Sequence, residues 1–287
     1  HRAVVGGGGL GNVGNAMNGI AAPALPNSTL LPVVAPPAIA VEDLTVSYRH
    51  HPAVHHVSCR FEPGSLTAVI GPNGAGKSSL LDALTGRVQP STGRVRTGGL
   101  PRNRLAYMPQ QSGIDRTFPL GVLDVVMLGA WPRIGWFTGA TTAQRAQALL
   151  ALASVGLAGF EQRLISELSV GQFQRVLFAR VLMQDAPVIL LDEPFNAIDT
   201  RTTADLMRLV QHWHDEGRTV IAVLHDLAQV REHFPLTLLL ARECVAHGPT
   251  EEVLVPRHLM RAQQMAEQWD ENADWCAAPV LVSRAPS

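Results

Sequence analysis

The chain has 287 residues, of which 46% are hydrophobic and 16% are charged, and its formal net charge is −1. The hydrophobic content excludes a wholly disordered chain, and the lack of a basic excess argues against a nucleic-acid-binding protein. The length is sufficient for one hydrophobic core with a subdomain. The three cysteines have no C-x-x-C spacing, which favours a reducing compartment such as the cytosol.

The amino-terminal segment, residues 1–37, differs in composition from the rest. No Asp, Glu, Lys or Arg occurs between Ala3 and Val41, and the segment contains four consecutive glycines and five prolines. These residues interrupt the continuous apolar helix that a membrane span or a signal peptide requires. We expect residues 1–37 to form a flexible extension that precedes the globular body.

Strands and helices alternate along the body. The hydrophobic pattern predicts strands at residues 41–48, 57–61, 65–70, 188–191 and 219–224. It predicts helices at residues 76–85, 141–155 (with Thr141 as N-cap), 171–183 and 200–216. This alternation is typical of an α/β fold whose mainly parallel sheet is covered by helices on both faces.

The clearest motif follows the strand predicted at residues 65–70. It matches G-x-x-x-x-G-K-[ST] and consists of Gly71, Pro72, Asn73, Gly74, Ala75, Gly76, Lys77 and Ser78, with Ser79 next. Glycines let backbone N–H groups surround phosphate oxygens, and the start of the following helix favours negative charge. We expect Lys77 to contact the β- and γ-phosphates of a nucleotide, and the Ser78 hydroxyl to bind Mg²⁺.

An acidic pair, Asp192 and Glu193, ends the apolar strand that starts at Val188. A carboxylate at the end of a strand beside a phosphate loop is where the magnesium ligand of a P-loop NTPase lies. We therefore expect Asp192 to hold Mg²⁺, through water, and Glu193 to polarise the attacking water.

A third segment narrows the class. Residues 168–176 read Leu-Ser-Val-Gly-Gln-Phe-Gln-Arg-Val and resemble the L-S-G-G-Q-x-Q-R-V signature of ABC-type ATPases. Further landmarks of that family occur in the same order: Tyr48 at the A-loop, Gln110 at the Q-loop, Asp199 at the D-loop and His225 at the H-loop.

The resemblance implies an α/β fold of the P-loop NTPase (RecA-like) type, with an antiparallel β subdomain and a helical subdomain. On this basis the ATPase domain would span residues 38–262, with the helical subdomain at about 113–170, and a tail would follow at 263–287.

The resemblance also implies a role for each landmark. Two copies would stack head to tail around two ATP molecules, with Tyr48 against adenine. Glu193, His225 and Gln110 would form the catalytic set, and Ser78, Gln110 and Asp192 would surround Mg²⁺. The residues that would act across the face between the copies are Ser169, Gly171, Gln172 and Asp199.

One position departs from the family pattern. Val170 replaces the first glycine of the signature. Because valine is bulkier and restricts φ, we expect a weakened closed dimer rather than an inactive site.

The segment after Gln110 resembles the zinc and manganese branch of ABC importers. The similarity lies in Ile114-Asp115-Arg116-Thr117-Phe118-Pro119 and in Gly135-Trp136-Phe137. It implies a divalent cargo ion, with ATP and Mg²⁺ as cofactors and no nucleic-acid partner. The implied partners are a second ATPase copy, a membrane permease and a periplasmic or extracellular metal-binding protein. The implied location is peripheral, on the cytoplasmic face of the cell membrane.

Several alternatives remain open. The chain could be a soluble ABC ATPase of the repair or translation type, a metal-chelate importer ATPase, or a module without catalysis, for which Val170 is the only indication. A separate alternative concerns residues 49–56, which fit a solvated hairpin loop. The four imidazoles of that segment are also potential Zn²⁺ ligands: His50, His51, His55 and His56.

Overall fold

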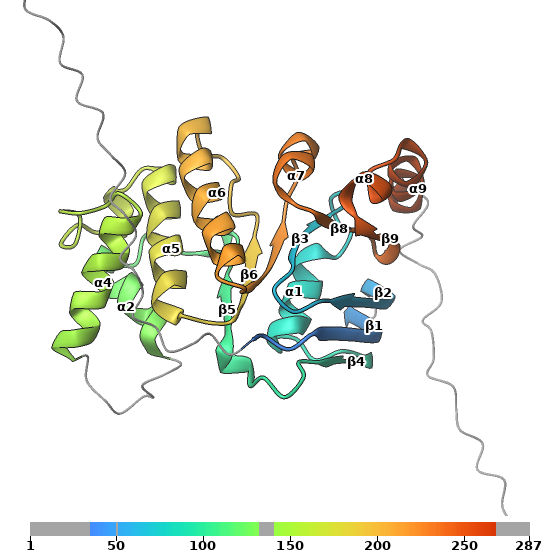
Figure 1. Cartoon of the computed structure of the whole chain (residues 1–287), viewed down its shortest axis with the longest axis horizontal. Coiled ribbons are helices and arrows are strands. Elements are labelled where there is room, and N and C mark those ends of the chain that lie inside the picture. The colour runs from blue at the N-terminus through green and yellow to red at the C-terminus, as the bar shows by residue number, and fades with distance from the viewer. Residues whose placement is uncertain (1–34, 50, 132–140, 268–287) are drawn as a thin grey trace, which may run out of the picture.

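The computed structural model describes residues 35–49, 51–131 and 141–267. The chain forms two sheets and a group of helices (Figure 1). The larger sheet has six strands in the order β5-β6-β7-β3-β8-β9, and the smaller sheet has three in the order β2-β1-β4. Most of the predicted extension and most of the predicted tail lie outside the described residues, as does the Gly135-Trp136-Phe137 segment.

The six-stranded sheet is parallel except for its last strand. Its members are β5 (Leu105–Met108), β6 (Val188–Asp192), β7 (Thr219–Val223), β3 (Leu66–Ile70), β8 (Leu236–Ala241) and the antiparallel β9 (Glu243–Pro249). Every residue of β3, β6 and β7 is buried, as expected for strands covered on both faces. The prediction of a mainly parallel α/β sheet is confirmed.

The register of this sheet brings three strand ends together. Asp192 of β6 pairs with Val223 of β7, which also pairs with Val69 of β3. Because these strands are parallel, the segments that follow them leave the same edge of the sheet. Those segments are the phosphate loop, Glu193 and His225.

The smaller, antiparallel sheet contains β1 (Ile39–Tyr48), β2 (His51–Phe61) and β4 (Thr92–Arg96). Helix α1 (Lys77–Thr85) lies between the two sheets, and its Leu80, Leu81 and Leu84 are fully buried against both. Gly86 ends the helix in the left-handed conformation, with φ 75°. The start of α1, and with it Lys77, is therefore held in place by packing from two directions.

The prediction that residues 49–56 form a hairpin loop is wrong, because most of them belong to a strand. Strand β2 starts at His51, which pairs with Tyr48, and Pro52 pairs with Ser47. Proline is tolerated here because β2 is an edge strand, where a missing N–H leaves no neighbour unpaired. His51, His55 and His56 are consequently strand residues, and His56 has φ 48° at a place where the register shifts.

Helices on the other side of the sheet form a lobe, seen on the left of Figure 1. It consists of α2 (Val122–Met127), α4 (Thr142–Ser154) and α5 (Val170–Gln184), with the short 3₁₀ segments η3 (Leu128–Ala130) and η4 (Ile165–Glu167). Thr141 caps α4 by accepting from the N–H of Gln144, as predicted. Helix α5 packs against α2 and α4 and also against β5, so it connects the lobe to the sheet.

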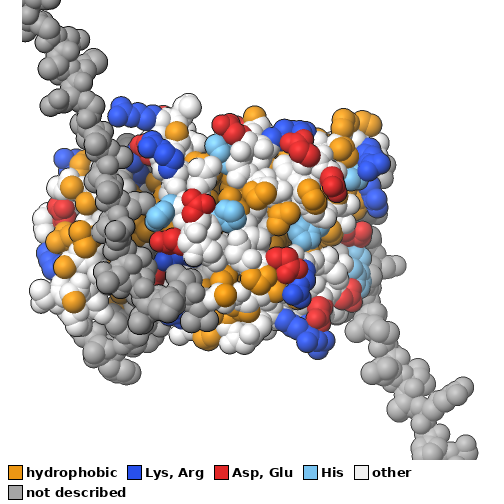
Figure 2. All heavy atoms as spheres, viewed as in Figure 1, with side chains coloured by type: hydrophobic (Ala, Val, Ile, Leu, Met, Phe, Trp, Pro, Cys, Tyr) orange, Lys and Arg blue, Asp and Glu red, His pale blue; other side chains and the backbone are white. Residues whose placement is uncertain are grey.

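The remaining helices cover the sheet and its end. They are α6 (Thr200–Asp215), α7 (Leu227–His233), α8 (Thr250–Val253) and α9 (Pro256–Glu267); short 3₁₀ segments η1 (Arg102–Arg104) and η2 (Gln111–Gly113) flank β5. No helix in the described ranges is long and apolar enough to cross a bilayer. On the face seen in Figure 2, basic and acidic side chains are interspersed rather than gathered by sign.

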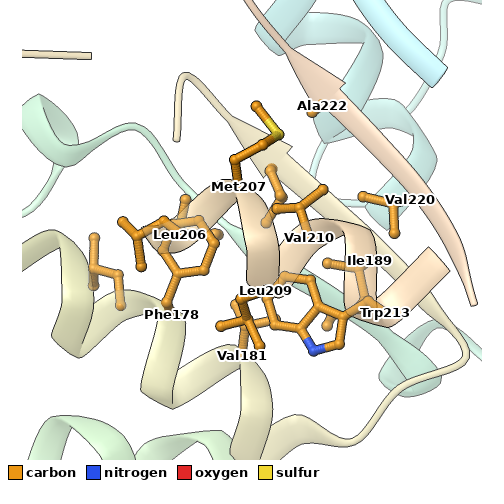
Figure 3. Close-up of a cluster of buried hydrophobic side chains, with 14 of the residues drawn as sticks. Phe178, Val181, Ile189, Leu206, Met207, Leu209, Val210, Trp213, Val220 and Ala222 are labelled. Atoms are coloured by element: carbon orange, nitrogen blue, oxygen red, sulfur yellow. The ribbon is translucent and has the colours of Figure 1, made fainter. Parts of the chain in front are cut away.

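A buried cluster joins α5 and α6 to the sheet (Figure 3). The rings of Phe178 and Trp213 stack with their centroids 5.8 Å apart and their planes 9° apart. Leu206, Met207 and Val210 of α6 meet Ile189 of β6 and Val220 of β7 in the same cluster. This packing fixes the helix that starts at Val170 relative to the strand that ends at Asp192.

Candidate active site

The phosphate loop connects β3 to α1 through left-handed backbone that only glycine adopts readily. Gly74 and Gly76 have φ 77° and 86°. A Cβ at Gly76 would overlap the carbonyl oxygen of Ala53 in β2, and one at Gly71 would overlap that of Leu240 in β8. The loop therefore needs glycine for both conformation and space. In the same loop, Ala75 is buried, whereas Asn73 and Gly74 are exposed.

Lys77 is the only lysine in the chain. Its side chain folds back over the loop, and Nζ donates to the carbonyl oxygens of Gly71 at 2.8 Å and Pro72 at 2.9 Å. Burial lowers the pKa of Lys77, whereas the negative charges of Glu193 and Asp192 act in the opposite direction. The one amine of the loop thus faces the backbone that would surround phosphate.

Asp192 lies at the end of β6 and is only 2% exposed. Burial raises the pKa of this carboxyl, while a hydrogen bond from Ser78 lowers it. Among the described residues Oδ1 of Asp192 has no hydrogen-bond partner. A buried carboxylate oxygen beside a serine hydroxyl matches the oxygen ligands that Mg²⁺ takes in P-loop proteins, so these residues fit the ion.

Tyr107 of β5 is a neighbour of Asp192 that no sequence motif indicates. Its hydroxyl shares a hydrogen bond with Asp192, and burial, together with the charges of Asp192 and Asp82, raises the pKa of Tyr107. The tyrosine therefore stays protonated beside the carboxylate. Only the tertiary arrangement reveals this contact, because nothing in the local sequence distinguishes Tyr107 from an ordinary strand aromatic.

Glu193 follows Asp192 and is held by three side chains, which lie in the segments that follow β5, β6 and β7. Its Oε1 lies 2.6 Å from Nε2 of His225, and its Oε2 accepts from Nε2 of Gln110 at 2.7 Å and Nδ2 of Asn196 at 3.0 Å. The backbone of Glu193 is left-handed, with φ 51°, and its side chain is 13% exposed. The structure thus brings together the three predicted catalytic residues and adds Asn196, which the sequence pattern did not indicate.

A cavity of about 330 Å³ adjoins this group. It is lined by Glu193, Asn196 and His225 together with residues of the segment that leads into α6. Such a volume is large enough for water molecules next to the carboxylate. Glu193 therefore lies where it could accept a proton from water.

Ser169 and Asp199 each cap a helix. Ser169 accepts from the N–H of Gln172 at the start of α5, and Asp199 accepts from the N–H of Thr202 at the start of α6. The hydrogen bonds from Thr202 lower the pKa of Asp199. Gly171 lies beside this second cap, since a Cβ there would be 3.7 Å from both Asp199 and Thr202. The two landmarks are thus neighbours on adjoining helix starts.

Val170 occupies the first position of α5. It is not among the described residues with positive φ, so the replacement of glycine imposes no backbone conformation that valine resists. Its side chain is 38% exposed, and its carbonyl oxygen accepts from Nε2 of Gln111 at 3.0 Å. Any effect of Val170 must therefore come from the bulk it presents to solvent or to a partner.

Tyr48 lies at the end of β1, with 45% of its surface exposed. Nearby, the rings of His55 and His56 touch edge to face with 4.4 Å between their centroids, but the two imidazoles pair with different carboxylates. His55 pairs with Glu243 at 3.2 Å, whereas His56 pairs with Asp43 at 2.7 Å. No group of three His, Cys, Asp or Glu side chains that could hold a metal ion occurs in residues 35–49, 51–131 and 141–267, and His50 lies outside them.

Comparisons with known proteins agree with this geometry. The sequence profile described as ABC transporter matches residues 54–196. The zinc transport system ATP-binding protein TroB of Treponema pallidum is 41% identical over 78% of this chain and 86% of its own length. The manganese transport system ATP-binding protein MntB of Listeria monocytogenes is 39% identical over 77% of this chain and 94% of its own.

Solved structures show the same fold. A transporter of proposed metal-chelate ABC type, in an inward-facing conformation, has a TM-score of 0.70 at 28% identity over 79% of this chain and 89% of its own. The dimeric structure of MJ0796, a bacterial ABC transporter cassette, has a TM-score of 0.64 at 28% identity, over 74% of this chain and 98% of its own. The chain therefore belongs to the ABC transporter family, as the subunit that binds and hydrolyses ATP.

Proposed function

We propose that this chain powers the transport of a divalent metal ion, zinc or manganese, through a partner membrane permease. The observation that carries the enzymatic half is the position of Glu193, held by Gln110 and His225 at the same sheet edge as Asp192 and Lys77. The names of the two relatives at about 40% identity support the choice of cargo.

The nucleotide would bind along the edge where β3, β6 and β7 end. The loop formed by Gly71, Pro72, Asn73, Gly74 and Ala75, with Gly76, would surround the phosphate oxygens, and its residues other than Pro72, which has no N–H, would donate backbone N–H groups. Lys77 would exchange its two carbonyl contacts for phosphate oxygens. Ser79 is half-buried in the first turn of α1, where a hydroxyl could donate to phosphate. The exposed Tyr48 would stack on adenine.

Ser78, Asp192 and Gln110 would hold Mg²⁺. When bound, the ion would neutralise part of the phosphate charge. Gln110 donates to Glu193 and would turn toward the ion through its side-chain oxygen, which makes it a sensor of the loaded site. Asp192 would supply negative charge, and a bound cation would favour its ionised form, against the effect of burial on its pKa.

Hydrolysis would begin with proton transfer from water to Glu193. Gln110, Asn196 and His225 fix the orientation of the Glu193 carboxylate. A water molecule in the adjoining cavity would therefore meet a carboxylate that is already oriented to accept its proton. His225 would contact the γ-phosphate and position the nucleophile.

A second copy would complete the site. Ser169 and the first N–H groups of α5 lie on a helix start that faces solvent, which suits an anion supplied from outside the chain. Gly171, Gln172 and Asp199 lie at or beside this helix start and would take part in the same face. A dimer would thus place each signature against the nucleotide of its partner.

The domain organisation follows from this proposal. Residues 38–262 would form the ATPase domain, and the helical subdomain at about 113–170 would dock on the permease on the cytoplasmic face of the membrane. Residues 263–287 would form a tail; the first of them continue α9 to Glu267. A periplasmic or extracellular metal-binding protein would deliver the ion.

The test is transport by the purified chain reassembled with its permease in vesicles. ATP-dependent uptake of Zn²⁺ or Mn²⁺, abolished by Glu193→Gln, is the expected result. Uptake of a ferric chelate but neither free ion would favour the metal-chelate alternative, for which the TM-score of 0.70 is the supporting observation. ATP hydrolysis that no permease stimulates would favour a soluble ATPase not coupled to transport.

A further inference from the structure

The signature helix is connected to Glu193 by a buried glutamine. Gln174 lies on α5 and is only 2% exposed. Its Nε2 donates to the carbonyl oxygen of Pro194 at 2.5 Å. Pro194 is the residue after Glu193, so this hydrogen bond fixes the backbone one residue beyond the proposed base, at the peptide that joins Pro194 to Phe195.

The other end of the same amide faces the segment that contains Gln110. The Oε1 of Gln174 accepts from Nε2 of Gln111 at 3.2 Å. The same Gln111 nitrogen also donates to the carbonyl of Val170, the first residue of α5. Gln111 therefore contacts the signature helix at its first turn and at its second.

These contacts close a ring. Gln110 donates to the carboxylate of Glu193, Pro194 accepts from Gln174, and Gln174 accepts from Gln111, which is the chain neighbour of Gln110. The side chain of Glu193 and the backbone of the next residue, Pro194, are thus both tied to the dipeptide Gln110-Gln111. A rigid shift of α5 cannot occur without stretching one of the hydrogen bonds in this ring.

A second set of contacts holds the two sides of the ring together. Arg116 donates to the carbonyl of Ile165 at 3.2 Å and to that of Leu168, directly before the signature. Its guanidinium lies 4.9 Å from the ring centroid of Phe173 on α5. The stretch from Gln111 to Arg116 is therefore attached to the signature at both of its ends.

Because Gln174 is buried, loss of its hydrogen bonds would destabilise the structure around Glu193. A buried carbonyl that loses its donor is costly, because water does not replace the lost hydrogen bond. Glu193 has φ 51°, a backbone conformation that non-glycine residues keep only when their surroundings hold it. The hydrogen bond to Pro194 is one of the restraints that hold it.

We infer that Gln174 is a positioning residue for Glu193, which makes the orientation of the carboxylate depend on where the signature helix lies. This inference rests on the proposed role of Glu193 as the base. It assigns to the buried face of α5 a function that the exposed Ser169 does not have. A partner or nucleotide that moves the start of α5 acts on Glu193 through Gln174 within the same chain.

The test is the kinetics of Gln174→Leu, which removes both hydrogen bonds with little change of volume. We expect kcat to fall about 10- to 100-fold, as misplacement of a catalytic group commonly causes. The KM for ATP should remain within about twofold, because Gln174 contacts no part of the phosphate loop. A kcat equal to that of the wild type in the folded variant would overturn the inference.

A matched control is Gln211→Leu, which removes the side-chain hydrogen bond of Gln211 to His233, 3.2 Å long, away from Glu193. Its kcat should equal that of the wild type; an equal loss in both variants would show that any lost glutamine contact has this effect and would overturn the inference. If Gln174→Leu does not fold, Gln111→Leu breaks the other end of the ring, and a kcat unchanged by it would contradict the connection.

A double-variant cycle separates positioning from general stability. In the Gln110→Leu background the ring is already open, so Gln174→Leu should cost less than half of its effect on log kcat in the wild type. Additive effects would contradict the inference. Glu193→Gln separates failure of the proposed base from failure of the ring. If Glu193→Gln hydrolyses ATP at the normal rate, Glu193 is not the base. If Glu193→Gln loses turnover but Gln174→Leu keeps the wild-type kcat, only the role of Gln174 is overturned.

Discussion

Polar and titratable side chains gather in two regions of the molecule: the edge of the parallel sheet that carries the candidate active site, and the edge strand β2. They form a single hydrogen-bonded group in the first region and separate pairs in the second. Glu193, Gln110 and His225 are far apart in the chain but meet within hydrogen-bond distance. His55 and His56 are adjacent in the chain, yet they bond to different carboxylates, Glu243 and Asp43.

The difference follows from the partners that each side chain meets. The rings of His55 and His56 touch edge to face, with 4.4 Å between their centroids, but each imidazole pairs with its own carboxylate, and no third metal-binding side chain joins them among the described residues. Parallel strands end at a common edge, so single residues after several strands converge. Convergence from separate elements, rather than density in the sequence, is what makes a site here.

The largest effect on nucleotide binding is expected at the phosphate loop. Lys77→Ala should weaken ATP binding about 100-fold, because charge-assisted contacts to phosphate are lost. Equilibrium binding of a fluorescent ATP analogue measures this, with Arg145→Ala on the exposed face of α4 as the control. Affinity unchanged by the loss of the amine would contradict the loop as the phosphate site.

Asp192 predicts a pH-dependent affinity for Mg²⁺. Burial raises the pKa of its carboxyl, so the folded protein takes up this proton at a higher pH than the unfolded chain. As the pH falls toward the ordinary carboxyl range, protonation of Asp192 should therefore favour the folded state while it weakens Mg²⁺ binding.

Titration of ATPase activity with Mg²⁺ at several pH values measures this competition. The half-saturating Mg²⁺ concentration should rise in mildly acidic buffer. Asp192→Asn should raise it about 10- to 100-fold and remove most of the pH dependence. A variant that keeps the wild-type pH profile would show that another group controls the metal.

Asn196 should contribute a smaller effect on turnover. It is one of three donors to Glu193, so Asn196→Ala should lower kcat about 3- to 10-fold with an unchanged KM. Steady-state ATPase kinetics give both values, and Asn103→Ala, an exposed asparagine in η1, is the comparison. A changed KM alone would assign Asn196 to nucleotide binding instead.

The smallest effect is expected in β2. Simultaneous replacement of His51, His55 and His56 by alanine should leave ATPase activity and Zn²⁺ binding of the purified chain unchanged. Loss of the exposed His56–Asp43 pair should change the unfolding free energy by less than about 1 kcal/mol. Calorimetric titration with Zn²⁺ measures the binding. A Zn²⁺ ion that the wild type binds and the variant does not would show that these histidines form a metal site.

The sequence predicted the site better than it predicted the sheets. Lys77, Asp192, Glu193 and His225 each follow a buried strand or begin a helix, so the local pattern is enough to place them at one edge of a parallel sheet. Tyr107, Asn196 and Gln174 were missed because their partners are set by tertiary packing. Gln174 in particular reads as an ordinary signature residue until its contact with Pro194 is seen.

The strands missed by pattern have physical reasons of their own. Strand β5 has only four residues, and β4 alternates weakly between exposed and half-buried positions. The apolar run of β8 cannot be distinguished from part of a helix by periodicity alone. Pairing with neighbours, which the sequence does not display, decides all three.

The most direct test of the central claim is single-turnover hydrolysis of bound ATP by Glu193→Gln. The variant retains the shape of the site and can still hydrogen bond to His225 and Gln110, but it cannot accept a proton from water. The account predicts normal ATP affinity and a hydrolysis rate at least about 100-fold below that of the wild type. A rate within threefold of the wild type would contradict it.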